Sequence, residues 1–291
     1  VARAGFKRAA GLLVSANAEA NTLKQDALYR LGVLSANAHD WAGAQSAFSQ
    51  LLKLSPDAEQ LAEARFQVAY AAYRIGNLEE AVQGLEDFLS KHGKHVRSAS
   101  ARSTLGQALF RLGKFEPAIA AFRAVLTDPH ATPEAILDAR SRIGAASFND
   151  GDLDQAIATY RALLKDASGS AEIRAQILQP LAQAELTRGN LTEARQIASE
   201  EASGSLWSGD ILGKVGQAFL DKNQPKDALL ALEAIATPTL DQRYLLYKAR
   251  KANGDVSGAL ALLKTLAAEP GPQQPAWLYE LGDGHADRGE L

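Results

Sequence analysis

Few residues of this sequence could do chemistry. The sequence contains no cysteine, which excludes a thiol nucleophile, a disulfide and a cysteine-based metal site. It also contains no Gly-x-Ser-x-Gly elbow and no glycine-rich phosphate loop. His92 and His95 lie in a glycine-containing loop with no obvious third ligand, whereas a zinc site takes at least three protein ligands. The residue types therefore predict neither an enzyme nor a bound cofactor.

Three aspartates imitate the beginning of a calcium-binding loop. Asp150, Asp152 and Asp154 have the required spacing. Such a loop also needs glycine at its sixth position and glutamate at its twelfth, and this sequence has Gln155 and Arg161 there. We therefore expect no metal site, and we interpret the aspartates as a helix–helix turn with an acidic start to the next helix.

Charge and hydropathy limit the possible partners. The 291 residues are 46% hydrophobic and carry a formal net charge of −3, which gives no general attraction to nucleic acid or to a membrane surface. No apolar run is long enough to span a bilayer. A basic stretch, residues 91–114, contains lysines, arginines and two histidines but no acid. It is either a site for an acidic partner or an anionic polymer, or it is a solvated face, and we favour the solvated face because charge runs in helical repeats are commonly at the surface.

A helix–turn–helix pattern recurs along the chain. Its clearest copy runs from Leu105 to Leu126, with Gly113 at the turn, where a left-handed conformation is needed, and Pro117 in the first turn of the second helix. The equivalent turn residues are separated by 37, 37, 38, 38, 34, 31 and 35 residues, and they are His39, Gly76, Gly113, Gly151, Gly189, Asn223, Gly254 and Gly289. A fixed period in this range predicts a solenoid of helix pairs.

The pattern resembles the tetratricopeptide repeat (TPR) family. The first helices carry a small residue at one position, namely Gly32, Ala69, Gly106, Gly144, Ala182 and Gly216. The second helices carry an alanine and then bulky apolar residues, as in Ala118, Phe122 and Val125. The resemblance covers nearly the whole chain and implies an all-α, right-handed superhelical solenoid of antiparallel helix pairs. It says little about function, because this fold hosts many unrelated roles.

The repeats divide the chain. We interpret residues 1–24 as the second helix of a partial repeat, 25–205 as repeats one to five, and 206–291 as repeats six and seven with a truncated eighth. Ala198 and Glu201 stand where bulky apolar residues should lie in the fifth repeat, which predicts a hinge near residues 199–209. Since the chain starts and stops within a unit, its open ends either continue in a longer protein or meet another subunit.

The resemblance also implies which residues face a partner. In TPR proteins these are positions 2, 5, 9, 12 and 13 of each repeat, on the concave side of the first helices. From these positions we select as partner-binding Tyr29, Asn37, Phe66, Tyr70, Tyr73, Arg74, Gln107, Phe110, Arg111, Phe148 and Asn149. Aromatic side chains flanked by polar donors suit an extended or helical peptide, although large aromatics often pack in the core as well. The clamp of lysine, asparagine and arginine with which some TPR proteins hold a C-terminal carboxylate is absent.

These observations favour a non-enzymatic scaffold that binds a segment of a partner protein in its concave groove, with no nucleic acid as partner. The period of 37 or 38 residues and the alanine-rich sequence are similar to those of bacterial cell-envelope TPR proteins. That similarity implies a role in envelope assembly or export and a location in the periplasm or cell envelope, with the cytoplasm as the alternative. Two other functions stay open. In the first, the chain is the superhelical arm of a larger enzyme or polysaccharide exporter. In the second, it self-assembles through its open ends.

Overall fold

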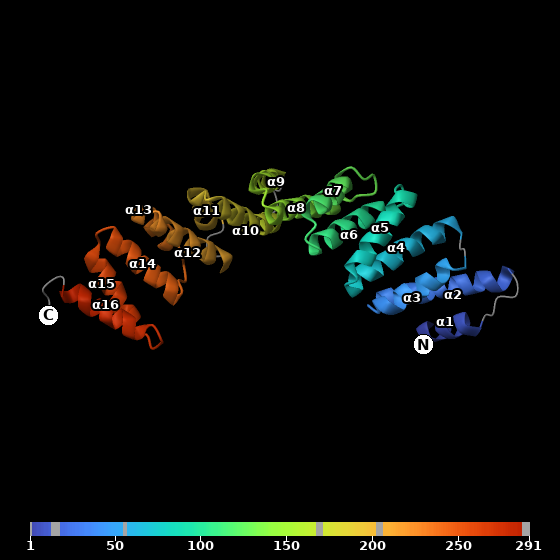
Figure 1. Ribbon diagram of the computed structural model, residues 1–291, viewed down its shortest axis with the longest axis horizontal. Helices are drawn as coiled ribbons and strands as arrows, with labels where there is room; N and C mark the ends of the chain where they lie inside the picture. The colour runs from blue at the N-terminus through green and yellow to red at the C-terminus, as the bar shows by residue number, and fades with distance from the viewer. Residues whose placement is uncertain (1, 13–17, 55–56, 167–170, 202–205, 287–291) are drawn as a thin grey trace. The chain divides into compact units, whose positions relative to one another are not determined.

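A computed structural model describes residues 2–12, 18–54, 57–166, 171–201 and 206–286. The described residues form sixteen α-helices and one short π-helix, with no strand among them. The chain divides into two compact units, Val1–Asp152 and Leu153–Leu291. Unit 1 therefore contains α1 to α8 and unit 2 contains α9 to α16 (Figure 1). The expected all-α fold of stacked helix pairs is confirmed.

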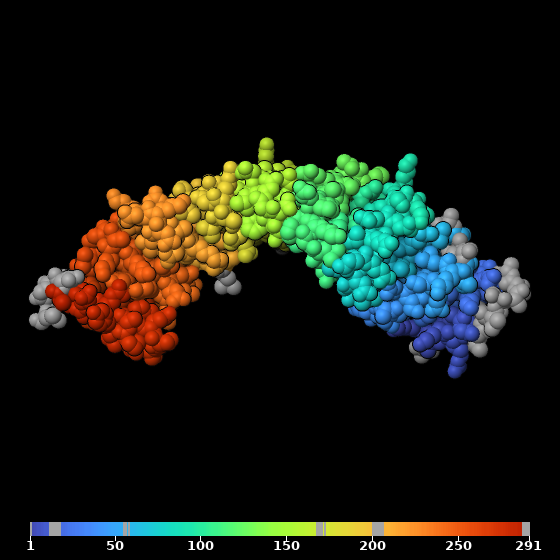
Figure 2. Space-filling view, in the orientation of Figure 1, coloured from blue at the N-terminus to red at the C-terminus, as the bar shows by residue number. Residues whose placement is uncertain are grey.

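The helices of unit 1 pack in the order in which they occur in the sequence. They are α1 (Ala2–Leu12), α2 (Ala18–Asn37), α3 (Trp41–Leu52), α4 (Ala58–Ile75), α5 (Leu78–His92), α6 (Ser98–Arg111), α7 (Phe115–Leu126) and α8 (Pro133–Asp150). Each helix contacts the next, and the first helices α4, α6 and α8 also contact one another in turn. In the space-filling view the colours of unit 1 form adjoining bands (Figure 2), as nearest-neighbour packing of repeats produces.

Unit 2 repeats the arrangement, and two of its second helices are short, with 6 and 8 residues. Its helices are α9 (Leu153–Asp166), α10 (Ala171–Arg188), α11 (Leu191–Gln196), α12 (Leu206–Asp221), α13 (Pro225–Leu232), α14 (Leu240–Ala252), α15 (Val256–Ala267) and α16 (Gln274–Ala286). Successive helices are in contact, and so are the first helices α10, α12 and α14. The short helix α11 continues into the π-helix Ile197–Glu201.

The turns have the conformation that the period predicts. Seven of the eight turn residues are described, and all seven have positive φ: His39 (58°), Gly76 (102°), Gly113 (72°), Gly151 (90°), Gly189 (89°), Asn223 (57°) and Gly254 (85°). Gly289 lies outside the described residues. Because a left-handed residue ends each first helix, the chain reverses there and the second helix returns along the first.

Helix starts follow local capping. The side chain of Asp57 accepts a hydrogen bond from Gln60 N and begins α4, and Thr132 accepts one from Ala135 N and begins α8, with Pro133 at the first helical position. The boundary that we drew at residue 24 falls inside α2, which begins at Ala18. The division of the chain into repeats otherwise stays a prediction.

The predicted hinge near 199–209 also stays a prediction, because residues 202–205 lie outside the described residues. What the structure shows beside them is the π-helix, in which Ile197 and Ala198 are buried. Ala198 is thus a core residue despite its small size. None of the described helices is long and apolar enough to cross a membrane.

Candidate functional site

The residues selected as partner-binding all belong to first helices of unit 1. They lie on α2 (Tyr29, Asn37), α4 (Phe66, Tyr70, Tyr73, Arg74), α6 (Gln107, Phe110, Arg111) and α8 (Phe148, Asn149). Since α4 contacts α6 and α6 contacts α8, side chains that are one repeat apart in the sequence can meet on this face.

A groove with a volume of about 570 Å³ crosses α4, α6 and the beginning of α8. Four of the selected residues line it, namely Tyr70, Tyr73, Arg74 and Gln107. The rest of the helical lining comes from α6 (Ala99, Ser100, Ser103, Thr104) and from α8 (Ala135, Asp138). His130 and Thr132, from the loop before α8, also line the groove. Sequence reasoning missed these two, because loop residues carry no periodic signal.

A hydrogen-bonded chain of side chains joins α4 to α6 in the groove. The hydroxyl of Tyr73 donates to Gln107 Oε1 at 2.9 Å, and Gln107 Nε2 donates to Ser103 Oγ at 3.3 Å. Tyr73 and Gln107 are both half-buried. These contacts hold the groove side chains in place without a bound partner, which lowers the conformational entropy that binding would cost.

Arg74 is held by aromatic rings. Its guanidinium carbon lies 4.3 Å from the centre of the Trp41 ring and 5.8 Å from that of Tyr70, and Nη1 donates to the Tyr70 hydroxyl at 3.0 Å. Trp41 and Tyr70 meet edge to face with centroids 5.7 Å apart. Trp41, the first residue of α3, thus contacts the first helix of the next repeat, α4.

Arg111 repeats this arrangement on α6. Its guanidinium carbon lies 5.4 Å from the centre of the Tyr73 ring, on the neighbouring first helix. Phe110 beside it contacts Phe115 edge to face at 5.4 Å and packs against the core of unit 1. Arg111 is exposed and Phe110 half-buried, so the arginine is the more accessible of the two.

Phe66 is a correction to the selection. It is only 4% exposed and packs against Phe88 of α5 with ring centres 5.7 Å apart. Its ring also stacks on Tyr70 at 5.8 Å. Phe66 therefore lies in the core beneath Tyr70 and supports the groove without forming its surface.

The remaining selected residues lie outside the groove. Tyr29 of α2 contacts Phe48 edge to face at 6.0 Å, and Asn37 is exposed at the end of the same helix. Phe148 is half-buried near the end of α8. Asn149 is exposed, and its Nδ2 donates to Ala145 O at 2.8 Å.

The fold compensates much of the charge of the basic stretch. Three of its cations pair with acids, as Lys91–Asp87, Arg97–Glu63 and Arg102–Asp128. The hydrogen bond from Lys91 lowers the pKa of Asp87. Burial lowers the pKa of His92, and the nearby charge of Arg65 adds to that effect. Among the described residues no group of three or more histidine or acidic side chains could hold a metal ion.

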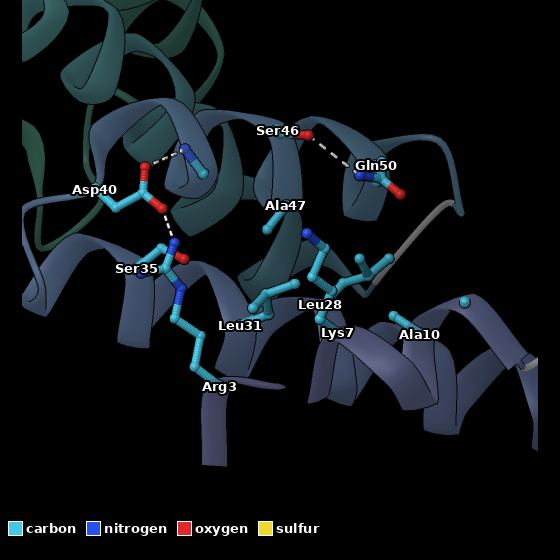
Figure 3. Close-up of a pocket in the computed structure, with 12 residues that line it drawn as sticks. Arg3, Lys7, Ala10, Leu28, Leu31, Ser35, Asp40, Ser46, Ala47 and Gln50 are labelled. Carbon is cyan, nitrogen blue, oxygen red and sulfur yellow. Dashed lines mark hydrogen bonds and ion pairs between the residues drawn. The ribbon is translucent and has the colours of Figure 1, made fainter. Parts of the chain in front are cut away.

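A second pocket of unit 1, about 370 Å³, lies between α1, α2 and α3 (Figure 3). Arg3 and Lys7 reach into it from α1, and Arg3 forms an ion pair with Asp40. Asp40 also accepts a hydrogen bond from Gly43 N at 2.9 Å and so caps α3. Asp40 and its partners Arg3 and Gly43 thus join α1 to the helix pair α2 and α3.

Two family models match parts of the chain. A tetratricopeptide repeat model matches residues 103–173 and 146–210, and the outer membrane lipoprotein model YfiO matches residues 21–111. No curated protein matches the sequence.

Solved structures share the fold at low sequence identity. A tetratricopeptide repeat protein from Parabacteroides merdae is 17% identical with a TM-score of 0.54, over 90% of this chain and 98% of that chain. A chain of the Naa15/Naa10 complex bound to HypK-THB is 16% identical with a TM-score of 0.57, over 90% of this chain and 39% of that chain. MamA from Desulfovibrio magneticus RS-1 is 14% identical with a TM-score of 0.51, over 62% of this chain and 97% of that chain.

At these identities the structural similarity shows the fold alone. Together with the repeat model and the positive-φ turns that recur through both units, it defines the class of protein. The described helix pairs form a solenoid of the tetratricopeptide-repeat type, and residues 103–210 match the model of that repeat family.

Proposed function

We propose that this protein is a non-enzymatic scaffold that holds a segment of a partner protein in the groove across α4, α6 and α8. The groove itself carries the proposal, since Tyr70, Tyr73 and Arg74 of one repeat and Gln107 of the next line a single open surface. Aromatic faces beside fixed hydrogen-bonding groups are the features with which proteins bind extended or helical peptides.

The other exposed or half-buried residues of the selection extend this surface. In our proposal Phe110, Arg111, Phe148 and Asn149 contact the segment along α6 and α8, and Tyr29 and Asn37 contact it on α2. Phe66 supports the groove from the core.

We also propose that the protein acts in the envelope of a bacterium, in an assembly or export system. The support is the match of residues 21–111 to an outer membrane lipoprotein family, since this segment includes Tyr70, Tyr73, Arg74 and Gln107. In this proposal the partner is an envelope protein and the groove is reached from the periplasm.

Photo-crosslinking tests both proposals. The purified protein carries p-benzoylphenylalanine in place of Ser100, which is exposed in the groove, and is irradiated with periplasmic or cytosolic extract of the producing organism. The matched control carries the same group in place of Glu116, an exposed residue of α7 that does not line the groove. Mass spectrometry identifies the adducts.

We expect a defined adduct with the periplasmic extract from position 100 and none from position 116. The adduct should disappear when Tyr73→Ala is added, because that change removes a groove wall and the hydrogen bond to Gln107. Equal adducts from both positions would place the interaction elsewhere on the protein. An adduct found only with cytosolic extract would support the groove and contradict the envelope location.

A further inference from the structure

The acids at partner-facing positions of unit 1 are neutralised by the protein itself. Position 2 of the repeats, one of the partner-facing positions that the TPR resemblance implies, is an acid in α2, α4 and α8. Each of these acids has an arginine partner: Asp26–Arg30 at 2.8 Å, Glu63–Arg97 at 2.9 Å and Asp138–Arg142 at 2.7 Å. The acid in the groove lining, Asp138, is among them. These carboxylates therefore contribute little net negative charge to the surface.

Two cations on the same face are not neutralised. Within the described part of the chain neither Arg74 nor Arg111 forms an ion pair with a carboxylate. Both are exposed, and they hold the same position in successive repeats. The face of α4 and α6 thus has a local positive charge, although the chain as a whole carries a formal net charge of −3.

The aromatic rings keep both guanidinium groups available. Arg74 lies on Trp41 at 4.3 Å and Arg111 lies near Tyr73 at 5.4 Å. A guanidinium that stacks on a ring retains the N–H groups at its edge, and two of these can bind one carboxylate through parallel hydrogen bonds. Because the rings already restrict the arginine side chains, less entropy is lost when a carboxylate binds.

We infer that the segment held in the groove is acidic, with aspartate or glutamate side chains that pair with Arg74 and Arg111. Apolar side chains of the same segment lie on the rings of Tyr70 and Tyr73. This inference rests on the proposed function and names the chemistry of the partner. Side-chain carboxylates fit better than a chain terminus, because the two arginines come from different repeats and a single terminal carboxylate would serve one of them.

Defined peptide pools test the inference. Two fluorescein-labelled pools of amidated dodecapeptides share the same randomised leucine, tyrosine, serine and glycine positions and differ only in carrying glutamate or glutamine at every third position. Fluorescence polarisation measures the binding of each pool to the wild-type protein. The test variant is Arg74→Gln/Arg111→Gln, and the control variant Arg8→Gln/Lys53→Gln removes the same charge from exposed residues outside the groove.

We expect the glutamate pool to bind the wild type and the control variant at least tenfold more tightly than the glutamine pool does. This preference should vanish in the Arg74→Gln/Arg111→Gln variant and weaken as salt is added. A second variant, Arg74→Lys/Arg111→Lys, keeps the charge but not the paired donors and should show an intermediate preference. Circular dichroism of every variant verifies that it is folded.

The inference is overturned if the two pools bind equally, or if the preference survives in the Arg74→Gln/Arg111→Gln variant. Equal binding that is lost on Tyr73→Ala would leave the proposed function standing without the acidic partner. Absence of binding by both pools would count against the groove as a peptide site and against the inference together.

Discussion

Three glycines of the first helices lie directly beneath large side chains of the second helices. A methyl group added at Gly32 would lie 2.6 Å from Phe48, one at Gly106 would lie 2.6 Å from Phe122, and one at Gly216 would lie 2.5 Å from Leu232. Phe48, Phe122 and Leu232 are all at most 2% exposed, so they have no free space into which to move. The absence of a side chain on the first helix is therefore what lets the two helices of a pair approach.

We expect Gly106→Ala to destabilise the protein. Overpacking of this kind costs about 1–3 kcal/mol, and the better helix propensity of alanine returns at most about 1 kcal/mol. Urea denaturation followed by circular dichroism measures the change. Gly5→Ala in α1 is the matched control, because apart from the backbone of its own helix and its chain neighbours nothing lies within 4 Å of the added methyl group, and it should be neutral or stabilising. Equal midpoints for the two variants would contradict the packing argument.

In the two turns without glycine, the positive φ angle strains the backbone, and a glycine would relieve this strain. His39 and Asn223 have φ values of 58° and 57°, a conformation that costs an ordinary residue about 1–2 kcal/mol and asparagine less. His39→Gly should therefore stabilise the protein by about 1 kcal/mol, and Asn223→Gly by less. The converse change, Gly76→Ala at φ 102°, should destabilise it. Thermal denaturation of the three variants ranks them, and a loss of stability in His39→Gly would show that its ring contact with Trp41 outweighs the strain.

At the residue scale, the sequence identified the aromatic side chains but not how deeply each of them is buried. Phe66, Tyr70 and Tyr73 lie on one helix at spacings that put them on nearby faces. Phe66 is buried against Phe88, whereas Tyr70 and Tyr73 line the groove. A small rotation of α4 about its axis decides between these outcomes, and that rotation is set by packing against α5 and α6 rather than by the residues of α4. The repeat positions alone could not distinguish the residue that supports the groove from the core from the residues that form the groove surface.

At the scale of helices, a buried carboxylate joins three elements of unit 2. Glu185 of α10 has a fully buried side chain. Its Oε1 accepts from Arg161 of α9 at 2.7 Å, and its Oε2 accepts from Asn190, the residue before α11, at 2.7 Å. Arg161 also pairs with the half-exposed Glu193 at 3.1 Å. One acid thus fixes the start of α11 relative to the two preceding helices.

Removing Arg161 should destabilise the protein more than removing its exposed partner Glu193. Arg161→Ala leaves Glu185 buried with one donor, which costs about 2 kcal/mol. Glu193→Ala removes an exposed pair, which costs less than about 1 kcal/mol. Chemical denaturation of the two variants at neutral pH gives the comparison. Similar losses in both variants would show that Glu185 is adequately held by Asn190 alone.

Helix boundaries show what local sequence can and cannot predict. The side chains of Asp57 and Thr132 accept the capping hydrogen bonds that begin α4 and α8, and such capping depends only on residues within one turn. Ser98 is the first residue of α6 and is fully buried, and the residue before it, Arg97, makes no side-chain capping hydrogen bond. The early start of α2 at Ala18 and the π-helix after α11 have no local signal of this kind, so the sequence did not predict them.

On the scale of the whole molecule, stability should be a sum of local terms. Within each unit, each described helix makes its main contacts with the helices before and after it in the chain. The first helices α4, α6 and α8 also contact one another in turn, and so do α10, α12 and α14. In such a protein a change in one repeat is felt by its neighbours and fades beyond them. The groove depends on α4, α6 and α8 together, so it should be sensitive to packing defects in these repeats and indifferent to defects several repeats away.

Hydrogen exchange measured by mass spectrometry tests this locality. We expect Gly106→Ala to raise amide exchange in α6 and α7 and, to a smaller extent, in α5 and α8, because these helices share the core around Phe122. Exchange in α2 and in α12 to α15 should stay at the wild-type level. Arg161→Ala should give the complementary pattern, with raised amide exchange in α9 to α11 and exchange at the wild-type level in α3 to α6. A uniform rise through both units for either variant would show all-or-none unfolding of the chain. In that case, substitutions far from the groove would weaken peptide binding as much as substitutions beneath it.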